Sequence, residues 1–151
     1  TSGLDTLLAD DVVFQSPAVH TPQVGKAVTK RYLEAALRVL NSDSFRYVGE
    51  WSGERSAVLE VETVIEGLQL NGVDMIHWND DGRIVRFKVM VRPVKALLSL
   101  MPLMTKELQA IDPGRAPYAQ PTGSYGSLGK FRRTQSRVSL SCSRTTSLLE
   151  P

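Results

Sequence analysis

The sequence predicts an α+β fold in which a curved antiparallel sheet wraps around helices and leaves a conical pocket. Three observations predict it. Residues 26–41 carry apolar side chains at helical spacing, and so do residues 94–111. Between them, residues 45–92 alternate or cluster β-branched and aromatic residues, as strands do. Helices on either side of a block of strands favour helices gathered on one face of a sheet.

The first residues are expected to form the end of a helix followed by a short strand. Leu4, Leu7 and Leu8 have helical spacing, and residues 12–15 are rich in β-branched and aromatic residues. A loop over residues 17–22, bounded by two prolines, then leads to the helix predicted at 26–41. Most of a first helix is expected to be missing before Thr1.

Four strands are predicted after that helix, at 45–51, 57–66, 70–78 and 84–92. The last two flank the sequence Asn79-Asp80-Asp81-Gly82, which is typical of a tight hairpin turn. Pro93 cannot donate to a strand ladder and ends the last strand. Pro102 is expected to kink or divide the helix predicted at 94–111.

Composition divides the chain into a domain over residues 1–112 and a tail over 113–151. The first part carries 12 Lys and Arg against 15 Asp and Glu, a net charge of −3; the second carries 6 against 1, a net charge of +5. The tail is rich in Gly, Ser, Thr, Pro and Arg and lacks periodicity, which predicts a disordered basic segment. Because the basic excess lies in the tail, no specific nucleic-acid partner is predicted for the domain.

Several classes of protein are disfavoured. No apolar run approaches the roughly 20 residues that span a bilayer, and no signal peptide is visible, so a cytoplasmic protein is expected. The single Cys142 excludes an internal disulfide and a cysteine-based zinc site. Two histidines with scattered acids do not suggest a metal site, and no organic cofactor is implied.

Asp74 is the strongest functional candidate. Residues two apart on a strand share a face, so Asp74 points the same way as Ile76 and Trp78. Ionising a carboxyl group beside two apolar side chains is costly, and its pKa should rise if that face is dry. A neutral carboxyl group could donate a hydrogen bond to a ligand oxygen. The alternative is a solvated aspartate near the start of a strand.

Two stretches resemble a known family. They are residues 9–17 (ADDVVFQSP), followed by Gly25, and residues 73–84 (VDMIHWNDDGRI). Over residues 4–105 the chain resembles the nuclear transport factor 2-like superfamily of cone-shaped, cystatin-like α+β domains, in its ketosteroid isomerase and SnoaL-like branches. The superfamily includes isomerases, cyclases, dehydratases, epoxide hydrolases and non-catalytic scaffolds, so the resemblance implies the fold more strongly than the activity.

The resemblance implies roles for a few residues. Asp74 matches the protonated aspartate that, with a tyrosine, stabilises the enolate in ketosteroid isomerase. The isomerase's base falls at Ser16, and its tyrosine falls on the missing helix. The Asp-Arg-Asp set of the epoxide hydrolases is not matched, since its last aspartate falls near Val89. The expected ligand-binding wall is apolar, with Phe14, Ile76, Trp78, Phe87, Val89 and Val91.

Other polar candidates have simpler interpretations. Ser16 could contact a ligand or cap the loop at Pro17. His20, in that loop, could be catalytic at the pocket mouth or merely exposed. His77 lies on the strand face opposite Asp74, where a surface or dimer contact is expected.

The sequence therefore predicts a domain that binds a hydrophobic small molecule bearing a carbonyl or hydroxyl oxygen. If it is an enzyme, the reaction would be a proton transfer of the isomerase, cyclase or dehydratase type, without a cofactor. The alternative is a non-catalytic binding or dimerisation module. A homodimer through the convex face of the sheet is expected in either case.

Overall fold

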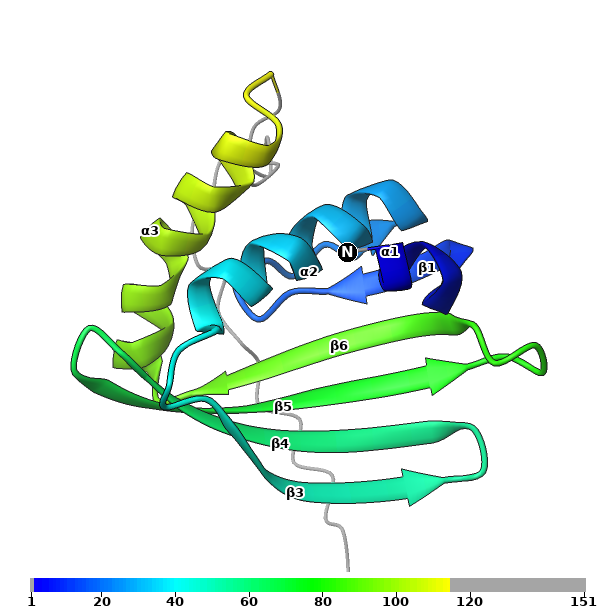
Figure 1. The fold of residues 1–151 in the computed structure, drawn as a ribbon, viewed down its shortest axis with the longest axis horizontal. Helices are drawn as coiled ribbons and strands as arrows, with labels where there is room; N and C mark the ends of the chain where they lie inside the picture. Colours follow the sequence, from blue (N-terminus) through cyan, green and yellow to red (C-terminus); the bar gives the residue numbers. More distant parts are fainter. Residues whose placement is uncertain (1, 115–151) are drawn as a thin grey trace, which may run out of the picture. The chain divides into compact units, whose positions relative to one another are not determined.

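The computed structural model describes residues 2–114 (Figure 1). The elements are α1 (Ser2–Leu7), β1 (Leu8–Gln15), β2 (Gln23–Val24), α2 (Lys26–Leu40), β3 (Arg46–Gly53), β4 (Ser56–Ile65), β5 (Leu68–Trp78), β6 (Ile84–Arg92) and α3 (Val94–Ile111). The predicted α+β class is confirmed. Disorder was predicted for residues 113–151. Residues 115–151 lie outside the described part of the chain.

The six strands form one mixed sheet, in the order β2-β1-β6-β5-β4-β3. Strands β3 to β6 follow one another as antiparallel neighbours, as predicted. However, β1 runs parallel to β6, so the sheet is not wholly antiparallel. The reason is the crossover through α2, which carries the chain from β1 to the far edge of the sheet. Three reversals then return it beside β1 in the same direction.

Two features at the N-terminal end differ from the sequence prediction. Leu8, which was assigned to the helix, begins β1, where it is fully buried and pairs with Ile84. The two-residue strand β2 pairs with β1 through Val13 and Val24 and was not predicted. A strand of two residues cannot be recognised by alternation, because alternation needs several successive residues to be visible in a sequence.

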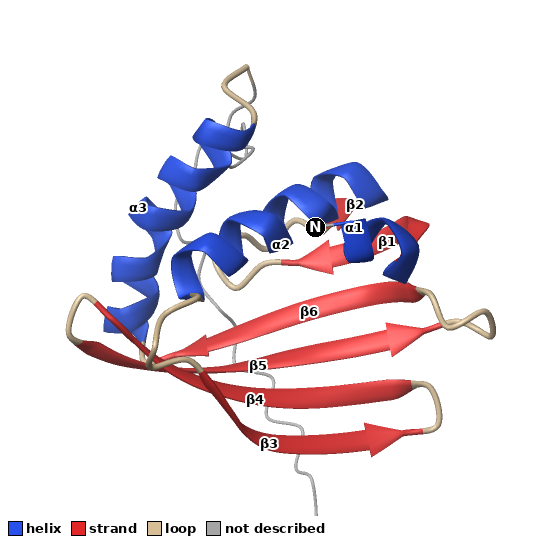
Figure 2. Ribbon diagram, viewed as in Figure 1, coloured by secondary structure: helices blue, strands red, loops and turns tan. Residues whose placement is uncertain are grey.

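Helices α2 and α3 lie over the same face of the sheet, which curves around them (Figure 2). On α2, Val28, Tyr32 and Ala35 recur at helical spacing and are buried. They pack with Phe14 of β1 and Leu108 of α3 in one core cluster. A second cluster joins the other half of α3 to the sheet through Ile65, Leu70, Ala96 and Leu100. The N-terminal and the C-terminal halves of α3 therefore both pack on the concave side, each in its own core cluster.

Two local predictions can be compared directly with the structure. The hairpin at residues 79–82 is present: the Asn79 side-chain oxygen accepts hydrogen bonds from the backbone N–H groups of Asp81 (3.1 Å) and Arg83 (2.9 Å). Gly82 has a φ of 73°, a conformation that favours glycine. Pro102 does not divide α3, which runs through it to Ile111. Pro102 is exposed, so water can bond the carbonyl group, four residues earlier, that loses its backbone donor.

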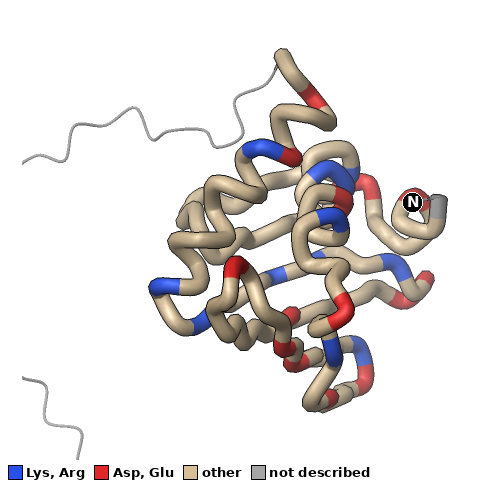
Figure 3. Tube along the Cα trace, turned by 60° about the vertical axis from the view of Figure 1, so that its left-hand side comes forward, with Lys and Arg blue, Asp and Glu red and all other residues tan. Residues whose placement is uncertain are grey.

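Acidic and basic positions are interspersed along this part of the chain (Figure 3). Lys26 pairs with Asp10 at 2.6 Å, and Arg31 pairs with Asp112 at 3.1 Å. The second pair joins α2 to the residue that follows α3, and its Arg31 side chain is almost completely buried. None of the helices between residues 2 and 114 is long and apolar enough to cross a bilayer.

Candidate functional site

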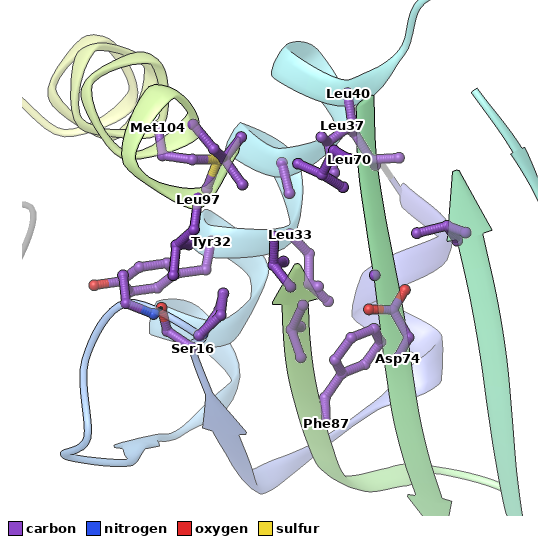
Figure 4. Close-up of a pocket in the computed structure, with 18 of the residues that line it drawn as sticks. Ser16, Tyr32, Leu33, Leu37, Leu40, Leu70, Asp74, Phe87, Leu97 and Met104 are labelled. Atoms are coloured by element: carbon purple, nitrogen blue, oxygen red, sulfur yellow. Dashed lines mark hydrogen bonds between the residues drawn. The ribbon is translucent and has the colours of Figure 1, made fainter. Parts of the chain in front are cut away.

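A cavity of about 340 Å³ lies between the concave face of the sheet and the helices (Figure 4). Its size is within the range of small-molecule sites. Apolar side chains supply most of the wall: those of Leu33 and Leu37 from α2, Leu70 from β5, Phe87 from β6, and Leu97 and Met104 from α3. Helix α1 adds Leu4. The cavity therefore draws on nearly every element of the fold.

The pairing of β4, β5 and β6 explains why Asp74 faces this cavity. In the sheet Asp74 lies directly between Leu59 of β4 and Val89 of β6. Residues opposite one another in a ladder share a face, so all three side chains project from the concave side. Gly72, two residues earlier, also lines the cavity, and a Cβ atom there would lie 3.2 Å from the carbonyl oxygen of Met90. The glycine leaves room beside the carboxyl group.

The Asp74 carboxyl group is unusual in its surroundings. It forms no hydrogen bond or ion pair with any other residue between 2 and 114. Burial raises its pKa from the usual 3.8 to about 6, because the apolar wall disfavours the charged form. A carboxyl group that titrates near neutral pH can both take up and release a proton under physiological conditions.

Tyr47 of β3 is a second polar residue of the cavity that the sequence analysis did not identify. Its ring packs edge-on against Phe45, with centroids 5.3 Å apart, and both residues line the cavity. Burial raises the pKa of the Tyr47 hydroxyl, and the negative charge of Asp74 raises it further. The strand register places the two residues near one another, because Tyr47 pairs with Val61 and Val61 pairs with Gly72, two residues before Asp74. Apolar alternation over 45–51 was the available signal, but a tyrosine fits it as ordinary core.

Ser16 also lines the cavity, and both of its predicted interpretations fit the geometry. Its hydroxyl oxygen accepts a hydrogen bond from the backbone N–H of Ala18 at 3.1 Å, which fixes the loop at Pro17. In Figure 4, Ser16 and Tyr32 lie on the side of the cavity away from Asp74. A hydroxyl in this place can orient a ligand, but it cannot replace a carboxylate base without an activating group.

The structure brings together four of the six residues that were predicted as an apolar wall. Phe14, Phe87, Val89 and Val91 line the cavity. Ile76 and Trp78 do not. Ile76 pairs with Phe87 one row beyond Asp74, and the register between β5 and β6 shifts between His77 and Trp78. The predicted wall therefore loses these two residues.

The histidines lie away from the cavity. His20 is exposed in the loop before β2 and does not line the cavity, so the structure does not place it at the pocket mouth. His77 is exposed on the opposite face of β5. Within residues 2–114 there is no group of three or more His, Cys, Asp or Glu side chains arranged to hold a metal ion.

Comparison with known proteins adds the family. No family model and no curated protein matches this sequence. Among solved structures, a steroid delta-isomerase from Pseudomonas aeruginosa is 41% identical, with a TM-score of 0.69, over 73% of this chain and 80% of that chain. A protein with a cystatin-like fold from Silicibacter pomeroyi is 30% identical, with a TM-score of 0.65, over 70% and 73%.

A de novo designed protein with a curved β-sheet shares only the fold, at 13% identity and a TM-score of 0.55. The two natural relatives match in sequence as well as in structure, over most of their own length. The chain therefore belongs to the nuclear transport factor 2-like superfamily, in its ketosteroid isomerase-like and SnoaL-like group.

Proposed function

We propose that the cavity binds an apolar small molecule that carries an oxygen, and that Asp74 meets this oxygen or moves a proton beside it. The observation that carries the proposal is the carboxyl group of Asp74, the only one among the described residues that line a mainly apolar cavity of about 340 Å³. A carboxyl group with no protein partner is costly to bury unless a ligand uses it. Phe14, Phe87, Val89 and Val91 would contact the apolar part of the ligand.

The reaction class that fits this site is proton transfer of the isomerase or cyclase type. The relative at 41% identity is a steroid delta-isomerase, which makes a steroid ketone the first compound to test. Such a reaction needs an acid–base group and an apolar wall but neither a metal nor a redox cofactor. A carboxyl pKa near 6 suits proton transfer at neutral pH.

Ligand binding can be tested by native mass spectrometry. We expect protein purified from a rich expression host, or mixed with a steroid ketone, to carry one small molecule per chain. The Asp74→Ala variant should retain much less of it, because the polar contact is lost. Asp81→Ala is the matched control, since Asp81 is exposed in the β5–β6 turn. Equal retention by the wild type and both variants would contradict a role for Asp74 in binding.

The alternative is a non-catalytic binding module, and one observation favours it. Ser16 stands where the isomerase base would fall, so the cavity has one carboxylate instead of two. Under this alternative the wild type would bind a steroid ketone without converting it. Absorbance of the conjugated product, formed from a ketone with a β,γ double bond, distinguishes the two functions.

We also propose a homodimer through the convex face of the sheet. Large apolar side chains are exposed there, and Trp51 (58% exposed) and Met90 (48%) are the main ones. Trp51 lies over Gly49, where a Cβ atom would come within 2.6 Å of the indole ring, so the indole packs closely against the backbone of β3. Exposed apolar side chains that include a tryptophan are typical of a protein interface.

Sedimentation velocity tests the dimer. The wild type should sediment as a dimer, and Trp51→Glu should shift it to the monomer, because a carboxylate would be buried without a partner at the interface. Leu98→Glu is the control, since Leu98 is 61% exposed on α3, away from the convex face. A monomeric wild type at micromolar concentration would contradict the proposed dimer.

A further inference from the structure

The charge of Asp74 is isolated among the residues that the structure describes. Of the described residues that line the cavity, Asp74 is the only aspartate, and no glutamate, lysine, arginine or histidine lies beside it in the wall. None of the ion pairs between residues 2 and 114 includes it. Once ionised, the carboxyl group therefore carries a negative charge that a cation from outside this part of the chain would have to balance.

The sheet register explains why the basic side chains of β6 do not reach Asp74. Asp74 pairs with Val89, the residue after Lys88. Successive side chains of a strand point to opposite faces, so Lys88 projects from the convex side, as does Arg86 two residues earlier. On the other side of Asp74, the ladder partner from β4 is Leu59. The strands on both sides of β5 thus surround the carboxylate with apolar side chains on its own face.

Aromatic rings lie near the carboxyl group instead. Phe87 pairs with Ile76 and lies diagonally from Asp74 across β5 and β6, a spacing that an aromatic side chain can bridge. Figure 4 shows the Phe87 ring on the same side of the cavity as Asp74. Tyr47 of β3 also lines the cavity, in the row next to Asp74. The faces of aromatic rings attract cations, so the carboxylate and the rings favour the same kind of ligand group.

We propose that the cavity binds apolar amines, whose protonated nitrogen pairs with the Asp74 carboxylate while the apolar body contacts the wall formed by α2 and α3. The inference rests on the proposed function only in that the cavity must bind a small molecule. It goes beyond that function, because an ammonium group needs the ionised form of Asp74, whereas a ligand oxygen that accepts a hydrogen bond needs the neutral form. No covalent bond forms or breaks.

The protonation states suit this pair at neutral pH. With a pKa of about 6, Asp74 is about nine-tenths ionised at pH 7. A primary alkyl amine resembles the lysine side chain, whose pKa is about 10.4, and is therefore protonated. The apolar surroundings strengthen the attraction between the two charges, which offsets the cost of removing both from water. The amine should bind between about pH 6 and pH 10, where both groups are charged.

Few other titratable groups face Asp74. Tyr47 is one, and burial together with the charge of Asp74 raises the pKa of its hydroxyl, which stays neutral at neutral pH. Tyr32 of α2 lines the cavity on the side away from Asp74 (Figure 4). Glu50 of β3 lies in the same row, across Leu59, but is exposed and outside the cavity. The wall residues from α1, α3, β1, β4 and β6 are apolar. A binding midpoint near pH 6 would therefore report on Asp74.

Isothermal titration calorimetry with two probes of the same shape tests the proposal. Adamantylamine and adamantanol share one apolar cage and differ only in an amino against a hydroxyl group. At about pH 7.5 the wild type should bind the amine about tenfold more tightly than the alcohol, because the contact is charge-assisted. At about pH 5 only about a tenth of Asp74 stays ionised, so the amine should bind about tenfold more weakly than at neutral pH. The alcohol should not weaken, since it does not need the charge.

Two variants separate the Asp74 carboxylate from the general charge of the protein. Asp74→Asn keeps nearly the same shape and should abolish both the preference for the amine and its pH dependence, while the alcohol still binds. Glu50→Gln is the matched control, since it removes a negative charge from the same row outside the cavity and should leave the preference in place. A preference that survives in Asp74→Asn, or that is absent in the wild type, would overturn the proposal.

The outcomes distinguish this inference from the proposed function. If the wild type binds adamantanol or a steroid ketone but not the amine, the inference fails and the proposed binding function stands; if it binds none of the three, both fail. NMR titration of the Asp74 carboxyl carbon with saturating adamantylamine tests the pairing itself. The midpoint should fall from about 6 by about one pH unit or more, because a bound ammonium group favours the carboxylate. An unchanged midpoint would overturn the proposed pair.

Discussion

Replacing Asp74 with Asn is expected to lower kcat/KM for a steroid ketone by about 10²- to 10⁴-fold, the usual contribution of a general acid–base group. Asparagine has nearly the same shape as aspartate but cannot take up or release a proton in this pH range. The apolar wall of the cavity stays intact, so the affinity for the ketone should change much less than kcat. Steady-state kinetics together with a direct binding measurement separates the two effects.

The same substitution is expected to stabilise the fold at neutral pH. In the folded protein the pKa of Asp74 is about 6 against 3.8 for an ordinary aspartate, which corresponds to about 3 kcal/mol. Between these values the folded state binds more protons than the unfolded state, so the free energy of unfolding of the wild type decreases as pH rises from about 4 to 6. The Asp74→Asn variant does not titrate at this position, so its free energy of unfolding does not fall in this way.

Urea unfolding at two pH values measures the difference. At pH 7.5, roughly, the Asn variant should exceed the wild type by up to about 3 kcal/mol, and at about pH 4 the two should agree. The Asp81→Asn variant, altered at an exposed turn residue, is the control and should show no such gain. A loss of stability at neutral pH in Asp74→Asn would mean that the carboxylate has a structural partner.

Replacing Leu108 with Ala is expected to cost about 3 kcal/mol in the free energy of unfolding, within the 2–5 kcal/mol seen for buried leucines. Leu108 of α3 is fully buried, in the core cluster that contains Phe14, Tyr32 and Ala35. Its removal leaves a void between α2 and α3 at the level where both helices line the cavity. Weaker ligand binding should accompany the loss of stability, since Met104 and Tyr32 pack beside it.

The matched control for Leu108 lies on the same helix. Leu98 is 61% exposed, so Leu98→Ala should change the free energy of unfolding by no more than about 0.5 kcal/mol. Both variants keep a strong helix former, which removes helix propensity as a cause. Urea unfolding of the two variants compares them directly. Similar losses from both would contradict the packing of α3 described above.

The elements with strong local signals could be predicted from the sequence. Apolar spacing gave the helix at 26–41, close to α2 at Lys26–Leu40, and the helix at 94–111, which is α3. The turn residues 79–82 identified the β5–β6 hairpin. These signals are local, because each depends only on residues a few positions apart in the sequence. The parallel pairing of β1 with β6 joins strands that are separated by residues 16–83, and it leaves no local pattern.

The candidate site could be predicted in part. Strand alternation put Asp74 on the same face as Ile76 and Trp78, but it does not show how far along a strand a cavity extends. Ile76 shares the face of Asp74 and still lies outside the cavity. Tyr47 was missed because a tyrosine in an alternating strand fits ordinary core packing, and the register of β3 and β4 shifts just after it, between Tyr47 and Gly49. A shift of one residue reverses which side chains face the cavity, and period-two alternation cannot follow it.

Asp74 is an ionisable group in a mainly apolar cavity, and no residue between 2 and 114 forms a hydrogen bond or ion pair with it. The most direct test is an NMR titration of the side-chain carboxyl carbon of Asp74 in the wild-type protein, with Asp74→Asn used to assign the signal. The structure predicts a midpoint near pH 6. A midpoint close to 3.8 would show that water or another group solvates the carboxylate, and it would contradict the account of this site.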